Sequence, residues 1–134
     1  ALTGTEVRKV IDAMKEGILA YGLNFSGGIM IINERCCLLV AGMQFDKTDP
    51  AATKNAYDLA KHLVVEIGKL GYGEYRAHLD IMDLASAQYG FNDHAYQRFV
   101  RKLKDAIDPN GILMPGRHGV WPKRYLPGGD LHQG

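Results

Sequence analysis

Apolar residues recur at helical spacing near the start of the chain. The intervals of three and four residues predict an amphipathic helix that begins near Thr3 and ends near Gly22. Thr3 and Glu6 have capping-box spacing, in which each side chain bonds the other residue's backbone N–H. Glycine commonly ends a helix because it adopts positive φ without strain. The predicted buried face consists of Val7, Val10, Ile11, Met14, Ile18 and Tyr21.

Two nearly continuous apolar runs follow, at residues 29–32 and 36–45. They are rich in branched side chains, and the polar residues 33–35 separate them, so they predict an antiparallel hairpin preceded by a loop over residues 23–28. Because polar residues do not alternate with apolar ones, we expect both faces of the hairpin to be covered. Cys36 and Cys37 should point to opposite faces, so we expect no disulfide between them.

The rest of the chain has a helical pattern that ends in turns. Asp49-Pro50 is typical of a helix start, and this helix should run out near Gly71. A weak helix is predicted over residues 81–88, and Asn92 or Asp93 can cap a last helix. The second helix should bury Ala56, Leu59, Ala60, Leu63, Ile67 and Leu70, and the last helix has Tyr96, Phe99, Leu103 and Ile107 on one face.

The predicted order is helix, strand, strand, helix, then helices and an extended tail, which is an α+β fold. Two strands alone make a poor sheet. We therefore expect the hairpin to belong to a larger sheet built by residues outside this chain. Ala1 is not a natural first residue, so the true N-terminus is expected to be missing.

Composition narrows the class of partner. The 134 residues are 46% hydrophobic and 23% charged with a net charge of +1, and no long run carries one sign, which argues against nucleic acid or an anionic membrane as partner. No apolar run is long enough to cross a bilayer, and no metal site is predicted because the cysteines and histidines lack ligand spacing. The adjacent cysteines fit a reducing compartment, and a cytoplasmic location is expected.

Turn-forming residues are concentrated in residues 108–122, here called the closing segment. Asp108-Pro109 should end the last helix, and Asn110-Gly111 and Pro115-Gly116 predict two further bends. Arg117 follows, between glycines that allow close backbone approach. Such a segment fits either an ordinary surface tail or a stretch shaped to lie against a partner or cofactor.

The closing segment resembles the end of FAD-linked oxidases of the vanillyl-alcohol oxidase and p-cresol methylhydroxylase type. Its first part, residues 108–116, is similar to FAD-linked oxidases more widely, including those that act on lactate and glycolate. The resemblance is narrowed to the phenol-oxidising branch by Gly119-Val120-Trp121-Pro122 and by Gly73-Glu74-Tyr75-Arg76-Ala77-His78. It covers nearly the whole chain but only the C-terminal quarter or so of such an enzyme.

Tyr75-Arg76 is the strongest candidate for chemistry. A phenol and a guanidinium can donate hydrogen bonds to one anionic oxygen, although adjacent side chains converge only on an irregular backbone. Taken alone, the dipeptide also fits a core tyrosine beside a surface arginine. The resemblance implies that Tyr75 and Arg76 bind the substrate phenolate and are catalytic. Glu74 could shape the pocket, but a solvated carboxylate is the favoured interpretation.

The resemblance implies further roles. Arg117 stands where the family usually has lysine, and with Arg76 it is expected to lie near the flavin ring. Ile31, on one strand face with Ile29, is expected to line the substrate pocket, although such a face is more often plain core. Residues that hold most of the FAD are absent from this chain. Residues 1–72 would be the end of a substrate-covering cap domain that contains the larger sheet, and residues 73–134 a segment returning to the FAD-binding domain.

We therefore expect this chain to be the C-terminal part of a flavin-dependent oxidoreductase, and to be inactive alone. The complete enzyme would oxidise para-substituted phenols such as vanillyl alcohol, eugenol and 4-alkylphenols. Hydride would pass from the benzylic carbon to FAD through a quinone methide. Expected partners are the phenol, the enzyme's own N-terminal part, further copies in a homo-oligomer and a cytochrome c acceptor. Two alternatives stay open: a 2-hydroxy acid oxidase or dehydrogenase fragment, and a non-enzymatic α+β binding or dimerisation module.

Overall fold

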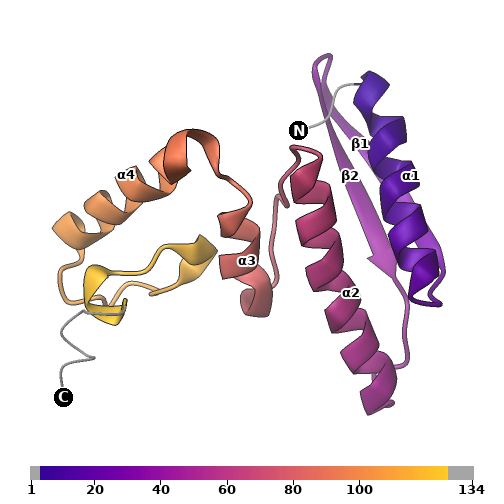
Figure 1. Ribbon diagram of the computed structural model, residues 1–134. Coiled ribbons are helices and arrows are strands. Elements are labelled where there is room, and N and C mark those ends of the chain that lie inside the picture. The colour runs from indigo at the N-terminus through magenta and orange to yellow at the C-terminus, as the bar shows by residue number, and fades with distance from the viewer. Residues whose placement is uncertain (1–3, 127–134) are drawn as a thin grey trace. The chain divides into compact units, whose positions relative to one another are not determined.

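Residues 4–126 are described by a computed structural model, shown in Figure 1. The chain divides between Gly73 and Glu74 into two units. The first unit contains α1 (Gly4–Ala20), β1 (Phe25–Asn33), β2 (Cys36–Met43) and α2 (Pro50–Lys69). The second contains the short 3-10 helix η1 (Leu79–Ile81), α3 (Met82–Ala87), α4 (Phe91–Ile107), η2 (Arg117–Gly119) and η3 (Lys123–Tyr125). The predicted α+β class is confirmed.

Local signals fix both ends of α2. The Asp49 carboxylate accepts a hydrogen bond from the backbone N–H of Ala51 at 2.8 Å, and Pro50 occupies the first turn. At the other end Gly71 has a φ of 89°. The backbone N–H of Tyr72 then donates back to the carbonyl of Ile67 at 3.2 Å, which satisfies an otherwise unpaired helix carbonyl.

The core of the first unit lies where α1 packs on α2 and on the hairpin (Figure 1). One cluster centres on Val7 and Val10 of α1, against Cys37 and Leu39 of β2. A second cluster joins α1 to α2 through Ile18, Leu59 and Leu63. These residues belong to the predicted buried faces, which are therefore confirmed for both helices. Thr3, the predicted capping residue of α1, lies outside the described residues.

The hairpin is longer than predicted at its start. β1 begins at Phe25, which pairs with Met43, and includes Gly27 and Gly28, which the sequence placed in a loop. Their backbone pairing with β2 outweighs the weak strand preference of glycine. The predicted turn is confirmed, and there the Asn33 side chain accepts from the backbone N–H of Arg35 at 2.9 Å.

The expectation that both faces of the hairpin are covered is wrong for the described residues. Cross-strand partners such as Ile31 and Cys37 share one face, and only part of that face meets the helices. Ile31 is 76% exposed. On the opposite face Met30, Ile32 and Val40 are all exposed. The residues of the continuous apolar pattern are therefore not all buried by the described part of this chain.

The start of α4 departs from the prediction. Neither Asn92 nor Asp93 caps the helix, because both have positive φ, as does His94, and the residue before the helix is Gly90, which makes no side-chain cap. Asparagine and aspartate tolerate this conformation better than most residues, which allows a tight bend instead of a cap. The predicted apolar face of α4 is present but exposed: Tyr96, Phe99, Leu103 and Ile107 are 46–76% accessible.

Candidate functional site

Tyr75 and Arg76 lie on an irregular segment at the start of the second unit. Residues 74–78 form neither helix nor strand. The guanidinium carbon of Arg76 lies 5.8 Å from the centre of the Tyr75 ring, within cation–π range. Both side chains are exposed, Tyr75 to 70%. The irregular backbone thus brings the two side chains together, which a regular strand would not do. The exposure of Tyr75 rules out a core position for it in the described part of the chain.

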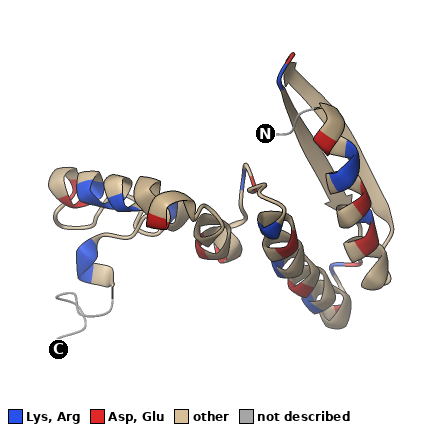
Figure 2. Ribbon diagram, turned by 45° about the horizontal axis from the view of Figure 1, so that its top comes forward, with Lys and Arg blue, Asp and Glu red and all other residues tan. Residues whose placement is uncertain are grey.

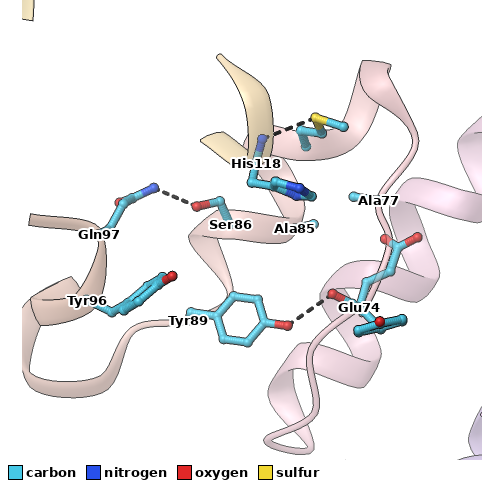
Figure 3. Close-up of a pocket in the computed structure, with 10 residues that line it drawn as sticks. Glu74, Ala77, Ala85, Ser86, Tyr89, Tyr96, Gln97 and His118 are labelled. Atoms are coloured by element: carbon cyan, nitrogen blue, oxygen red, sulfur yellow. Dashed lines mark hydrogen bonds between the residues drawn. The ribbon is translucent and has the colours of Figure 1, made fainter. Parts of the chain in front are cut away.

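A cavity of about 230 Å³ lies beside this segment, entirely within the second unit. Figure 3 shows its wall, built from the irregular segment, α3, the start of α4 and the closing segment. The lining is mixed, with three tyrosine rings and a few polar groups. The residues that line it are Glu74, Tyr75, Ala77, Met82, Ala85, Ser86, Tyr89, Tyr96, Gln97 and His118.

Glu74 is not the solvated side chain that the sequence favoured. Its carboxylate oxygen Oε2 is buried and has no hydrogen-bond partner among the described residues. Burial raises the pKa of the Glu74 carboxyl, and the nearby His78 lowers it by less. An unpaired buried carboxylate oxygen is costly. Glu74 therefore gives the cavity wall an unfilled hydrogen-bond acceptor (Figure 3).

The closing segment is held against α3. The Trp121 indole N–H donates to the carboxylate of Asp83 at 2.8 Å, and the backbone N–H of His118 approaches the sulfur of Met82 at 3.3 Å. Gly116, with a φ of 82°, lies under the Trp121 ring so closely that a Cβ there would come within 2.4 Å of it. Trp121 thus anchors the closing segment by packing and by its hydrogen bond, and Asp83 has a structural role.

Arg117 begins η2 directly after Gly116 and is exposed. Within residues 4–126 neither Arg117 nor Arg76 makes an ion pair, whereas Lys104 is paired with buried Asp108 at 2.7 Å. Both guanidinium groups are thus available to an external anion. Ile31 lies in the first unit, so its predicted role in the same pocket stays a prediction.

The two free arginines suit the ring system of FAD, which becomes negatively charged on reduction. The starts of α2 and α4 offer no glycine-rich loop of the kind that holds a pyrophosphate. The described residues therefore fit one part of the cofactor only. No group of three histidine, cysteine or acidic side chains in residues 4–126 could bind a metal ion, and no helix there is long and apolar enough to cross a membrane.

Sequence reasoning missed the roles of two residues that shape this unit. Tyr89 lines the cavity, and its hydroxyl donates to the backbone carbonyl of Glu74 at 3.0 Å. Asp108 is 5% exposed and its carboxylate accepts from the backbone N–H groups of Ile112 and Leu113, each at 2.9 Å. The Asp-Pro-Asn-Gly turn was a usable signal for Asp108, but nothing local marked Tyr89.

Comparison with known proteins identifies the family. No protein-family model matches the chain. It is 32% identical over 87% of its length to the 4-cresol dehydrogenase [hydroxylating] flavoprotein subunit of Pseudomonas putida, and 26% identical over 90% to 1'-carboxy-chondrochloren decarboxylase of Chondromyces crocatus. Among solved structures it matches 4-ethylphenol oxidase of Gulosibacter chungangensis, in an isoeugenol complex, with a TM-score of 0.85 and 33% identity over 92% of the chain.

The chain belongs to the vanillyl-alcohol oxidase and p-cresol methylhydroxylase family of FAD-linked oxidases. It corresponds to a C-terminal region of that family, and it spans only 22% of the two sequence relatives and 23% of the oxidase chain. The resemblance read from the closing segment and from Tyr75-Arg76 is thereby confirmed at the level of the family.

Proposed function

We propose that the chain is part of a flavoenzyme that oxidises para-substituted phenols. The observation that carries this proposal is the convergent, exposed Tyr75-Arg76 pair in a chain that has two relatives named for such phenols. The names of these two relatives specify 4-cresol and 4-ethylphenol, in which the alkyl group stands opposite the hydroxyl. Neither of these two names suggests a 2-hydroxy acid, so we favour a phenol as substrate over a 2-hydroxy acid.

Tyr75 and Arg76 would hold the substrate as its phenolate. A free phenol titrates near pH 10, so ionising it at pH 7 costs ~4 kcal/mol. One hydroxyl donor and one fixed cation at the same oxygen can offset that cost when water is excluded. The resulting phenolate donates electron density to the para substituent, which favours loss of hydride from the benzylic carbon and leaves a quinone methide.

FAD, when bound, accepts the hydride at this step. Arg117 and Arg76 would supply positive charge beside the ring, and arginine in place of the family's usual lysine keeps that charge with a different donor geometry. Ile31 would contribute an apolar wall to the substrate pocket. The parts of the enzyme that hold most of the FAD lie outside these 134 residues.

The two units fit a division between domains of the complete enzyme. We propose that residues 1–72 end a substrate-covering cap domain, whose larger sheet would include the hairpin, and that residues 73–134 return to the FAD-binding domain. One relative is named as a flavoprotein subunit, which supports a multi-subunit assembly. We propose a homo-oligomer that passes electrons to oxygen or to a cytochrome c.

The decisive experiment follows the flavin colour of the complete enzyme that contains this chain. Vanillyl alcohol, added without oxygen, should bleach the flavin absorbance near its long-wavelength maximum. Tyr75→Phe and Arg76→Ala should each slow this reduction by about 100-fold, the usual cost of losing one donor to an oxyanion. Arg8→Ala, at an exposed arginine paired with Asp12, is the matched control. The flavin of this variant should be reduced at the parent rate.

Other results would redirect the assignment. Reduction at an unchanged rate in both Tyr75→Phe and Arg76→Ala would remove these residues from the mechanism. A yellow protein that vanillyl alcohol leaves oxidised, but that lactate or glycolate reduces, would favour the 2-hydroxy acid alternative. A complete protein that purifies without flavin would favour the binding-module interpretation.

A further inference from the structure

The segment that carries Tyr75 and Arg76 has little backbone support of its own. Among residues 4–126, the backbone groups of residues 74–77 make no hydrogen bond to another backbone group. The segment follows directly on the boundary between the two units. Two adjacent side chains that must aim at one oxygen need a fixed backbone, because misplacement of about 1 Å weakens such contacts sharply.

Tyr89 provides a support from outside the segment. Its hydroxyl donates to the backbone carbonyl of Glu74 at 3.0 Å, as Figure 3 shows. This bond ties the backbone of residues 74–77 to a side chain that lies 15 residues further along the chain. Tyr89 is 50% exposed, and its partial burial, together with the charge of Glu74, raises its pKa. A tyrosine hydroxyl is protonated at neutral pH in any case, so it remains a donor.

Tyr89 is itself fixed to α3. Its backbone N–H donates to the carbonyl of Ser86 at 3.2 Å, at the end of that helix. The hydroxyl of Ser86 accepts a hydrogen bond from the Gln97 side chain of α4 at 2.7 Å (Figure 3). The closing segment is bonded to the same helix through Trp121 and Asp83. Through Tyr89, α3 supports residues 74–77, and it also holds the closing segment with Arg117.

We propose that Tyr89 is a positioning residue that holds the Tyr75-Arg76 pair in place for its anionic ligand, with α3 as the common support of this pair and of Arg117. The inference rests on the proposed function, because it assumes that the pair binds a phenolate. Without the Tyr89 hydroxyl, residues 74–77 would sample more backbone conformations. Fewer of these would aim both donors at one oxygen, so the anion would be held less well while FAD binding would be unchanged.

The test replaces Tyr89 with phenylalanine in the complete, flavin-loaded enzyme and uses vanillin as the probe. The phenolate form of vanillin absorbs at longer wavelength than the neutral form, so a pH titration of the bound aldehyde reports how well the site stabilises the anion. In Tyr89→Phe the pKa of bound vanillin should lie closer to the pKa of vanillin in free solution. Its dissociation constant should rise roughly fivefold, the effect of one lost hydrogen bond.

Tyr72→Phe is the matched control. It also removes a tyrosine hydroxyl that makes one hydrogen bond, here to Glu6 at 2.5 Å, but it lies in the first unit and its backbone is fixed separately by Ile67. This variant should bind and ionise vanillin like the parent. Equal changes in both variants, or none in Tyr89→Phe, would overturn the role of Tyr89.

The parent enzyme separates this inference from the function on which it rests. If the parent fails to lower the pKa of bound vanillin, the proposed function fails, whatever the variants do. If Tyr89→Phe does not load flavin, trypsin cleavage after Arg76 in the 134-residue chain gives a second measurement. That cleavage should accelerate roughly fivefold relative to cleavage after Arg35 in the hairpin turn. An unchanged ratio would also overturn the inference.

Discussion

Gly116 combines two constraints that only glycine meets at once. Its φ of 82° disfavours any side chain, and the face of the Trp121 ring occupies the space where a Cβ would stand. Gly71 has a similar φ of 89°, but nothing lies within 4 Å of the Cβ position. The two glycines therefore separate the cost of conformation from the cost of a blocked contact.

Gly116→Ala should destabilise the chain by about 3 kcal/mol, and Gly71→Ala by about 1 kcal/mol. The larger effect is expected because Trp121 must move and thereby lose its hydrogen bond to Asp83. Urea unfolding followed by far-ultraviolet circular dichroism measures both values. Equal losses of unfolding free energy in the two variants would mean that the Trp121 ring can move without destabilising the chain.

The family resemblance predicted part of the candidate site. Residue types alone left Tyr75 and Arg76 open between a core tyrosine beside a surface arginine and a functional pair, and the match to the family's pair singled them out. The glycines before them suggested the irregular backbone that the structure shows. Tyr89 was not found, because its role depends on a bond to a backbone carbonyl 15 residues away. The burial of Glu74 depends in the same way on packing that no local pattern encodes.

The turn after α4 is built around one buried carboxylate. Asp108 accepts from the ammonium of Lys104 and from two backbone N–H groups of the closing segment. Lys104 also donates to the carbonyl of Leu113. This set of bonds joins the last turn of α4 to the chain that follows it, so the shape of the closing segment depends on the charge of Asp108.

The second unit should lose stability in acid through Asp108. The hydrogen bond from Lys104, then those from Ile112 and Leu113, lower the pKa of this carboxyl below its usual value near 3.8. Because the folded-state pKa is the lower one, the stabilisation is complete above about pH 5 and is lost as the pH falls through 3.8 and below. Asp108→Asn should lower the urea midpoint at pH 7 and lose this acid dependence.

Asp12→Asn is the control for that measurement. Asp12 pairs with Arg8 on the surface of α1, where both side chains are well exposed, and such pairs contribute little. It should unfold like the parent at each pH. An Asp108→Asn variant with the parent's acid dependence would assign that dependence to other carboxyl groups.

Elements were predicted better where the signal is local. The start of α2 at Asp49-Pro50 and its end before Gly71 follow from capping chemistry, and both are confirmed. The start of α4 was wrong because asparagine and aspartate serve equally as caps and as residues with positive φ. The first residues of β1 were missed because glycine gives no strand signal, and only pairing with β2 defines them.

Two apolar surfaces remain uncovered in the described molecule. Figure 2 shows that both strands lack charged residues apart from the turn between them. The first is the hairpin, where Ile29 and Ile31 are exposed on one face and Met30, Ile32 and Val40 on the opposite face. The second, on α4, consists of Tyr96, Phe99, Leu103 and Ile107. Exposed apolar surfaces of this kind usually mark contacts with other protein, which fits a region of a larger enzyme.

The 134-residue chain by itself should therefore self-associate and enhance the fluorescence of an apolar dye such as anilinonaphthalene sulfonate. Ile31→Lys should weaken both effects because it places a charge at the most exposed position of the hairpin surface. Leu19→Lys, at a leucine of α1 that is 51% exposed outside both surfaces, is the control. Sedimentation velocity and dye titration would measure the outcome, and equal effects of the two variants would contradict the prediction.

Trp121 makes the tryptophan fluorescence of the molecule specific to one of its two units. It is the single tryptophan of the chain, and its indole is bonded to α3 within the second unit. Intrinsic tryptophan emission therefore follows only that half of the molecule, while peptide-bond signals sum over both halves. A protein with this arrangement carries a built-in label by which the folding order of its two halves can be resolved without any added dye.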